Sequence, residues 1–460
     1  MTRVLEFVVA LIMVFILAVI VGLFLPSHAH IERSIEISHN PQHIYDVLNN
    51  FRRFQDYAGG ELQAQDPKVK FTLSGPAYGK GATFNWSGSN DTIGSGTLVN
   101  ESGNIDLAGK STVTWGISND WRGKNKTFTF DVTPRQGQRV STVTWGYDVD
   151  YGWNLVDRYS QLWIHGAPAT MIQYGLDSLQ NMLAGIPNID YGKLNPGLYK
   201  ADATPVLLIS TKAPRTLDDI DAAKADALKQ IEGVMGKLGV KAAGPTTTIT
   251  TDWGDTNYTF DLAVPIDNTT VTIDGKPYDL TKLPPRPNPE QMAAAPASSA
   301  SAGQPASASS STETAESGPV PGSLDKLNQL IVNDSVRARM IPEREVLEAE
   351  WTGEAGIPLM RMALQAYAGT HGYDFNEATG RLYDQLTSLP SVANADQVYR
   401  VFLPVTNAPA QTPEQISGRA APLTALDPTL WSSAAPKPAD TEKKAESNKK
   451  PEKARKRHHR

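Results

Sequence analysis

The chain has 460 residues, with 43 Lys and Arg, 49 Asp and Glu, and no Cys. This length predicts two or three domains, the 40% hydrophobic content excludes a wholly disordered chain, and the lack of Cys excludes disulfides, thiolate metal sites and a cysteine nucleophile. The net charge of −6 is an average, because residues 437–460 hold ten Lys and Arg against four Asp and Glu. This tail therefore carries +6 and the rest carries −12. Nucleic acid is not expected as a partner, since the rest of the chain has no bulk basic character.

An uncharged apolar stretch predicts a membrane anchor within residues 1–30. Phe7 to Leu25 holds nineteen residues without a charge, and a helix of that length spans about 28 Å, close to the hydrocarbon core of a bilayer. A signal peptide has a shorter apolar region and a better cleavage site than the Ser-His-Ala that follows, so an anchor is favoured over a cleaved signal or a buried globular helix. Arg3 before the span favours a cytoplasmic N-terminus. We expect a single-pass protein of a bacterial inner (plasma) membrane, with its bulk in the periplasm.

Two segments lack the apolar residues that a core needs. The segment 284–341 opens with a Pro-, Ala- and Ser-rich stretch, which predicts a low-complexity insertion. The segment 407–460 predicts a disordered basic tail. Its clustered cations are expected to be solvated. Attachment to an anionic lipid or envelope surface is one alternative, and nucleic-acid binding, if the tail is cytoplasmic, is the other. What remains is two folded blocks and the linker between them: residues 31–187, 188–200 and 201–406.

The first block predicts a strand, two short helices, a run of strands and a long helix. Apolar and polar residues alternate in 31–38, as in a half-buried strand. Asn40-Pro41 predicts the cap and first turn of a helix, and a second helical piece is expected at 51–57. The hexapeptide STVTWG occurs twice, which places Trp115 and Trp145 at equivalent positions on two strands of one sheet. The closing helix is expected at 157–183, with an apolar face of Ile172, Leu176, Leu179 and Leu183.

This outline resembles the SRPBCC superfamily, the polyketide-cyclase or START-like fold. The resemblance is carried by the opening strand with HNPQHIYDVLNNFRRFQDY, by GPAYGKGATFNWSG at 75–88, by IGSGTLV at 93–99 and by Gly175-Leu176. It implies a helix-grip domain, in which an antiparallel sheet wraps on a long C-terminal helix and encloses a cavity. The candidates to line that cavity are aromatic, and plain core packing is the alternative reading for them: Trp86, Trp115, Trp145 and Tyr174.

The second block contains an internal repeat. Its first half, 201–283, runs from TPVLLISTKAP through a helix to NYTFDLAVPI. Its second half, 342–406, runs from REVLEAEWTGEAG through a helix to QVYRVFLPV. Each half is therefore expected to form a strand, a helix and two further strands.

Two such halves resemble the GyrI-like effector-binding domain of multidrug-sensing regulators, on the closing AVPI and FLPV motifs. The resemblance implies a pseudo-twofold α+β domain, so the whole chain is expected to be α+β with a transmembrane helix. Family members often place a carboxylate before an aromatic pair in the second half. Here Arg381 stands at the nearest match, which argues against cation binding. The candidate ligand-binding residues of this block, again with core packing as the alternative, are Trp253, Tyr258, Trp351, Arg381, Tyr383 and Tyr399.

No motif for catalysis, for a metal or for a cofactor is found. The sequence has no Gly-rich phosphate loop, no HExxH and no GxSxG elbow. His39 and His43 could share a helix face, but without an acidic third ligand we expect surface or capping histidines. The sequence predicts a membrane-anchored, non-catalytic protein that binds a hydrophobic or amphipathic small molecule, such as a lipid or an envelope stress compound. A cyclase- or aromatase-like enzyme that uses the helix-grip cavity, and a ligand-sensing regulatory protein, are the alternatives.

Overall fold

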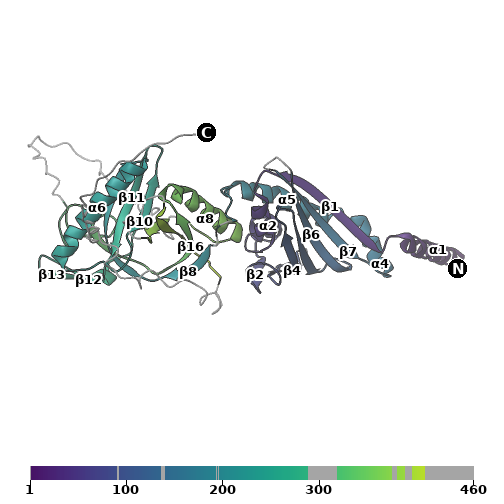
Figure 1. The fold of residues 1–460 in the computed structure, drawn as a ribbon. Coiled ribbons are helices and arrows are strands. Elements are labelled where there is room, and N and C mark those ends of the chain that lie inside the picture. The colour runs from purple at the N-terminus through teal and green to yellow at the C-terminus, as the bar shows by residue number, and fades with distance from the viewer. Residues whose placement is uncertain are drawn as a thin grey trace, which may run out of the picture.

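The computed structural model describes residues 2–90, 93–135, 140–192, 194, 196–287, 319–375, 381–388 and 396–409. The predicted basic tail lies outside the described residues beyond residue 409, and so does the predicted insertion from residue 288 to residue 318. The described chain is α+β, with one long N-terminal helix, two large antiparallel sheets and a few other helices (Figure 1).

Helix α1, Thr2–Phe24, covers most of the predicted apolar stretch. It is long and apolar enough to cross a membrane, by length and composition. Its side chains from Arg3 to Leu17 are exposed. Figure 1 shows that α1 projects from one end of the first sheet, as expected for a helix whose apolar side chains have no protein core around them.

The first unit is a seven-stranded antiparallel sheet in the order β1-β7-β6-β5-β4-β3-β2. Its strands are β1 His28–Ile37, β2 Lys70–Ser74, β3 Thr83–Ser87, β4 Ser95–Ile105, β5 Ser111–Asn119, β6 Lys124–Pro134 and β7 Ser141–Asp150. Its helical elements are α2 Pro41–Leu48, η1 Gln55–Gly59, α3 Gly60–Gln65, α4 Leu155–Tyr159, η2 Ser160–Trp163 and α5 Ala167–Ala184. The two STVTWG copies lie on β5 and β7 of one sheet, as predicted.

The helices of this unit agree only partly with the prediction. Asn40 caps α2 as expected, because its Oδ1 accepts a hydrogen bond from the backbone N–H of Gln42 at 2.9 Å. The long closing helix is instead divided into α4, η2 and α5, since the chain leaves the helical conformation at Gly166 and restarts with Pro168 in the first turn. The apolar face of α5 from Ile172 to Leu183 is buried as predicted. The second short helical piece begins at Gln55 rather than at residue 51.

The second unit is a nine-stranded sheet in the order β14-β15-β9-β11-β10-β17-β18-β16-β8. The strands are β8 Gly197–Ala201, β9 Thr204–Pro214, β10 Thr247–Trp253, β11 Asn257–Pro265, β14 Leu330–Ile331, β15 Arg337–Ile341, β16 Arg344–Thr352, β17 Tyr383–Leu386 and β18 Val398–Val405. The helices are α6 Leu217–Leu238, η3 Leu280–Lys282, η4 Glu354–Gly356 and α8 Ile357–His371, and β12 Thr270–Ile273 and β13 Lys276–Asp279 form a separate hairpin.

The two predicted halves of this sheet contribute their strands in opposite order. Each half contributes a strand, a helix and two further strands, and the order β9-β11-β10 is mirrored by β17-β18-β16. The halves meet where β10 pairs with β17, at Thr247 opposite Gln385. The middle of the sheet is therefore the junction of the two halves.

The edges of this sheet come from segments that were not predicted to be strands. Strand β15 lies in the segment predicted as a low-complexity insertion, yet it pairs with β9, and Val336 and Ala338 are fully buried. Strand β8 comes from the predicted linker and pairs with β16 at the opposite edge. The Pro-, Ala- and Ser-rich composition therefore covers only part of the segment 284–341, because the last part of that segment contributes core residues.

Helix α8 packs on both units. Ile357, Met360 and Leu364 lie in a core cluster of the second unit, whereas Ala363 and Ala366 join the core of the first. Figure 1 shows α2 and α8 facing each other where the two sheets meet, and the two helices are in contact.

Candidate functional site

The aromatic residues predicted to line a cavity in the first unit are packed in its core. Trp115 and Trp145 are both 0% exposed, and Phe130 lies between them, with ring centroids at 4.3 and 4.5 Å. The Trp115 indole donates a hydrogen bond to the Leu48 carbonyl oxygen at 3.0 Å. Helix α5 lies directly on the other indole, because a Cβ added at Gly175 would come within 2.3 Å of Trp145. These contacts favour the core-packing alternative for both residues.

The other two candidates of the first unit differ from each other in exposure. Trp86 is buried against Gly96, where an added Cβ would come within 2.1 Å of the indole ring. Tyr174 is 42% exposed on α5. Neither residue lines one of the two pockets described next.

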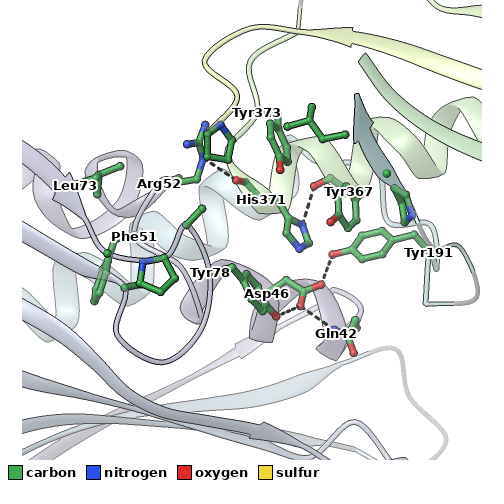
Figure 2. Close-up of a pocket in the computed structure, with 18 of the residues that line it drawn as sticks. Gln42, Asp46, Phe51, Arg52, Leu73, Tyr78, Tyr191, Tyr367, His371 and Tyr373 are labelled. Carbon is green, nitrogen blue, oxygen red and sulfur yellow. Dashed lines mark hydrogen bonds between the residues drawn. The ribbon is translucent and has the colours of Figure 1, made fainter. Parts of the chain in front are cut away.

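The larger pocket lies between the two units and is called the interunit pocket (Figure 2). Its volume is about 1390 Å³. The walls come from α2, from the segments 73–83 and 191–198, and from the C-terminal half of α8. Its aromatic and polar lining includes Gln42, Asp46, Arg52, Tyr78, Tyr191, Tyr367, His371 and Tyr373.

The buried carboxylate of Asp46 is the centre of this pocket's hydrogen bonds. It accepts from the Tyr78 hydroxyl at 2.6 Å, from the Tyr191 hydroxyl at 2.7 Å and from the Gln42 amide at 2.8 Å. Tyr191 also shares a 2.7 Å hydrogen bond with the Thr370 hydroxyl of α8. Burial, followed by the charge of Asp46, raises the pKa of both Tyr78 and Tyr191. Both phenols therefore stay protonated and act as donors.

Arg52 joins the first unit to the end of α8. Its guanidinium donates to the carbonyl oxygens of His371, Gly372 and Asn407. The last carbonyls of a helix carry partial negative charge, so a cation there is favourable. Tyr78 stacks on the His371 ring at 5.3 Å from across the pocket. The polar groups of the interunit pocket thus hold the two units together.

His39 and His43 are not surface residues, contrary to expectation. They are 4% and 0% exposed. The His43 ring stacks on Tyr191 with centroids 4.4 Å apart and an interplanar angle of 5°. Burial, with the neighbouring His39 as a second cause, lowers the pKa of His43 to about 4. His43 is therefore neutral at pH 7.

The smaller pocket lies between the two halves of the second unit and is called the repeat-interface pocket. Its volume is about 250 Å³. It opens between the N-terminal parts of α6 and α8, over β10, β11 and β17. Its lining is Arg215, Leu217, Ile220, Lys224, Thr248, Trp253, Tyr258, Glu354, Ala355, Ile357, Pro358, Arg361 and Asp384.

Two ion pairs, one buried and one part-buried, cross this pocket from one element to another. Lys224 of α6 pairs with Glu354 of η4, and Arg361 of α8 pairs with Asp384 of β17. The Arg361 and Asp384 side chains are 9% and 2% exposed. Burial opposes the charge of Arg361, but the adjacent Asp384 outweighs it and raises the Arg361 pKa. Burial raises the pKa of Glu354.

An aromatic wall completes the repeat-interface pocket. Trp253 and Tyr258 meet edge to face with ring centroids 4.7 Å apart. The Tyr258 hydroxyl accepts a hydrogen bond from Arg361 at 3.1 Å, and Arg215 lies over the Trp253 ring at 4.4 Å. Trp253 is 37% exposed, so part of the wall faces solvent. An apolar surface next to fixed polar groups is typical of sites that bind small molecules.

The remaining candidates of the second unit lie elsewhere. Tyr383 stacks on Phe402 at 4.6 Å, and the Tyr399 hydroxyl donates to the Gln397 side chain at 2.7 Å. Trp351 is part-buried on β16 and Arg381 is part-buried before β17, and neither lines a pocket described here. Of the ten predicted site residues, the structure brings Trp253 and Tyr258 together in one pocket.

The charged residues of the repeat-interface pocket were not predicted. Asp384 directly follows Tyr383, so a carboxylate does stand beside an aromatic residue in the second half, but after it instead of before it. Lys224, Glu354 and Arg361 lie on the apolar-patterned helices or next to them, where sequence patterns give no sign of their pairing. Within the described ranges, no group of three or more His, Asp and Glu side chains is placed to hold a metal ion.

The solved structures described in this paragraph resemble the chain only distantly. No protein-family model and no curated protein matches the chain. Norcoclaurine synthase from Thalictrum flavum is similar over 34% of this chain and 87% of its own, with 13% identity and a TM-score of 0.26. A solution structure from Thermobifida fusca covers 34% of this chain and 93% of its own, with 16% identity and a TM-score of 0.26. The C-terminal domain of EcmrR covers 47% of this chain and 99% of its own, with 8% identity and a TM-score of 0.29. Likenesses this distant carry no argument about what the chain does.

Proposed function

We propose that the chain is a membrane-anchored, non-catalytic protein that binds a small amphipathic molecule in the repeat-interface pocket. The observation that carries this proposal is the composition of the pocket, where a part-exposed aromatic wall lies beside one buried and one part-buried ion pair. Trp253, with Ile220 and Ile357, offers apolar surface to a ligand. Burial of apolar ligand surface contributes roughly 25 cal/mol per Å² before the costs of association.

The charges around the pocket favour a ligand without net charge. Three cationic and two anionic side chains line it, and Asp221 next to Glu354 adds a third carboxylate, so the formal charges cancel. Both pairs already neutralise their own charges, so an ionic ligand that bound to a member of either pair would have to disrupt that pair.

The proposal also includes an anchor and two domains. We place α1 across the bilayer, with residues 31–406 on the periplasmic side. Residues 31–187 are proposed as an SRPBCC-like helix-grip domain, supported by an antiparallel sheet with α5 packed on it. Residues 201–406 are proposed as a GyrI-like domain, supported by the mirrored strand order of the two halves.

Ligand binding can be tested with the full chain purified in a nonionic detergent. Native mass spectrometry would detect a co-purifying lipid or metabolite, and Nile red, an uncharged amphipathic dye, would report on the pocket by fluorescence. Trp253→Ala removes part of the wall, whereas Leu107→Ala removes a fully exposed apolar side chain from the turn between β4 and β5 of the first unit and serves as its control. Glu354→Gln disturbs one ion pair, and Glu350→Gln, on the exposed side of β16, is the matched control.

We expect saturable Nile red binding that Trp253→Ala and Glu354→Gln weaken several-fold and that the two controls leave unchanged. Loss of a co-purifying species in Trp253→Ala alone would place that species in the same pocket. Equal dye binding by Trp253→Ala and Leu107→Ala, with no co-purifying species, would refute the proposed site.

A further inference from the structure

A short segment beside α1 exposes large apolar side chains. It comprises α4 and η2 with the turn before them, residues 152–163, and is called the α4 shelf. Trp153 is 85% exposed, and Val156 and Leu162 are each 61% exposed. Three large apolar side chains exposed on one twelve-residue segment of the globular part require an explanation other than core packing.

The α4 shelf is attached to the last third of α1. The Tyr159 hydroxyl donates to the Ala18 carbonyl oxygen at 2.6 Å. Arg158 donates to the carbonyl oxygens of Leu23 at 3.1 Å and Leu25 at 3.2 Å, and so occupies the C-terminal end of the helix. Gly22 permits the close approach, because a Cβ there would lie 3.2 Å from the Tyr159 ring. The position of the shelf along α1 is therefore fixed.

The length of α1 sets the depth of these contacts. The helix starts at Thr2, and Ala18 is sixteen residues further on, so the part before the first contact extends about 24 Å at 1.5 Å per residue. The hydrocarbon core of a bilayer is about 30 Å thick. If α1 crosses the bilayer, as the proposed function holds, Ala18 lies inside the boundary of the hydrocarbon core. The segment bound to Ala18 must then reach the same boundary.

We propose that the α4 shelf is a second membrane-binding surface, which immerses Trp153, Val156 and Leu162 in the interfacial layer of the leaflet where α1 emerges. This inference rests on the proposed crossing of α1. Tryptophan and tyrosine are favoured at membrane interfaces, since their rings are apolar and their polar atoms remain near water. Arg158 lies 5.2 Å over the Trp153 ring, and Asp157 pairs with Arg122 at 3.2 Å, so charged groups accompany the apolar ones. The occupant of this surface is lipid, because the surface is continuous with the helix that crosses it.

Docking of the shelf fixes the orientation of the first unit. The strand ends near Lys124 and Asp150, which pair with each other close to α4, would face the headgroups. The β4–β5 turn with Leu107 would face away, because it lies at the other end of these strands. The first unit would thus have a fixed orientation relative to the membrane surface, instead of moving freely about its attachment to α1.

The absence of Cys makes a site-specific test direct, since any introduced Cys is unique. Val156→Cys and Leu162→Cys would be spin-labelled in the full chain and placed in nanodiscs of phosphatidylcholine and phosphatidylglycerol. Power saturation then compares collisions with oxygen, which enriches in lipid, and with NiEDDA, which stays in water. Leu107→Cys is the exposed control at the far end of the sheet, and Val8→Cys reports on α1 itself.

We expect labels at 156 and 162 to collide several-fold less with NiEDDA than the label at 107 does, with oxygen collisions retained. If the label at 8 lies in lipid but the labels at 156 and 162 are exposed to water, the α4 shelf does not bind lipid, whereas α1 still crosses the membrane. A label at 8 that is exposed to water would contradict both the membrane crossing of α1 and lipid binding by the α4 shelf. Labels at 156 and 162 shielded from oxygen as well as from NiEDDA would show a protein partner, and would also overturn lipid docking.

Discussion

Acid should weaken the joint between the two units through His43. This ring is 0% exposed, stacks on Tyr191 and has its pKa lowered from 6.5 to about 4 by burial and by His39. The unfolded chain binds this proton below pH 6.5, whereas the folded chain binds it only near pH 4. Stability from neutral His43 is therefore present above pH 6.5 and is lost as the pH falls toward 4.

The size of this effect follows from the two pKa values of His43. The full difference corresponds to about 3 kcal/mol, at about 1.4 kcal/mol for each pH unit. Between pH 7 and pH 5 the loss from this residue is about 2 kcal/mol. Burial also lowers the pKa of His39 and of His371, so these two residues contribute to the loss in the same direction.

Urea unfolding of the full chain in nonionic detergent at pH 7 and pH 5 measures the loss. His43→Phe keeps an aromatic ring against Tyr191 but cannot be protonated, so its stability should fall by about 2 kcal/mol less than that of the wild type over this interval. His165→Phe, at an exposed histidine, is the matched control and should retain the wild-type pH dependence. The reasoning is refuted if His43→Phe and wild type lose equal stability between the two pH values.

Three further substitutions test the packing and the charges. Gly175→Ala should destabilise by about 1–3 kcal/mol in urea unfolding, because its Cβ would overlap Trp145; a gain in stability, as glycine removal from a roomy helix gives, would contradict the contact. Asp384→Asn should lower the free energy of unfolding by about 3–5 kcal/mol, because Arg361 would remain buried without its carboxylate partner. An unchanged melting temperature would argue against this ion pair. Arg52→Gln should lower the free energy of unfolding by about 1–3 kcal/mol. It should also speed hydrogen exchange at residues 370–374, because the Arg52 guanidinium donates to carbonyl oxygens there. Unchanged exchange at these residues would disprove the capping role of Arg52.

Local and repeated patterns predicted most of the architecture. The alternating strand, the Asn40 cap and the two STVTWG copies each have a local signal, and all three appear in the structure. The halves of the second unit were predicted because their similarity is visible in the sequence. The break at Gly166 was not predicted, because the apolar periodicity continues on both sides of it.

Both pockets depend on contacts between residues far apart in the chain, and no local pattern in a single sequence reveals such contacts. Asp46 meets Tyr191, which is 145 positions away, and Tyr191 meets Thr370, a further 179 positions away. The ion pair between Lys224 and Glu354 spans 130 positions. Aromatic residues were identifiable as candidates, but pattern alone does not separate Trp253, on a pocket wall, from Trp115, in a core. That distinction depends on which strands become neighbours.

Helix α8 limits how the protein can be divided. Its N-terminal end carries Arg361 of the repeat-interface pocket, and its C-terminal end carries His371 of the interunit pocket. Between them, Ala363 and Ala366 fill the core of the first unit. A fragment that stops in the linker after residue 187 would lack both alanines and expose the apolar surface they cover. The two units should therefore unfold as one cooperative body, and their expression as separate domains should yield unstable halves.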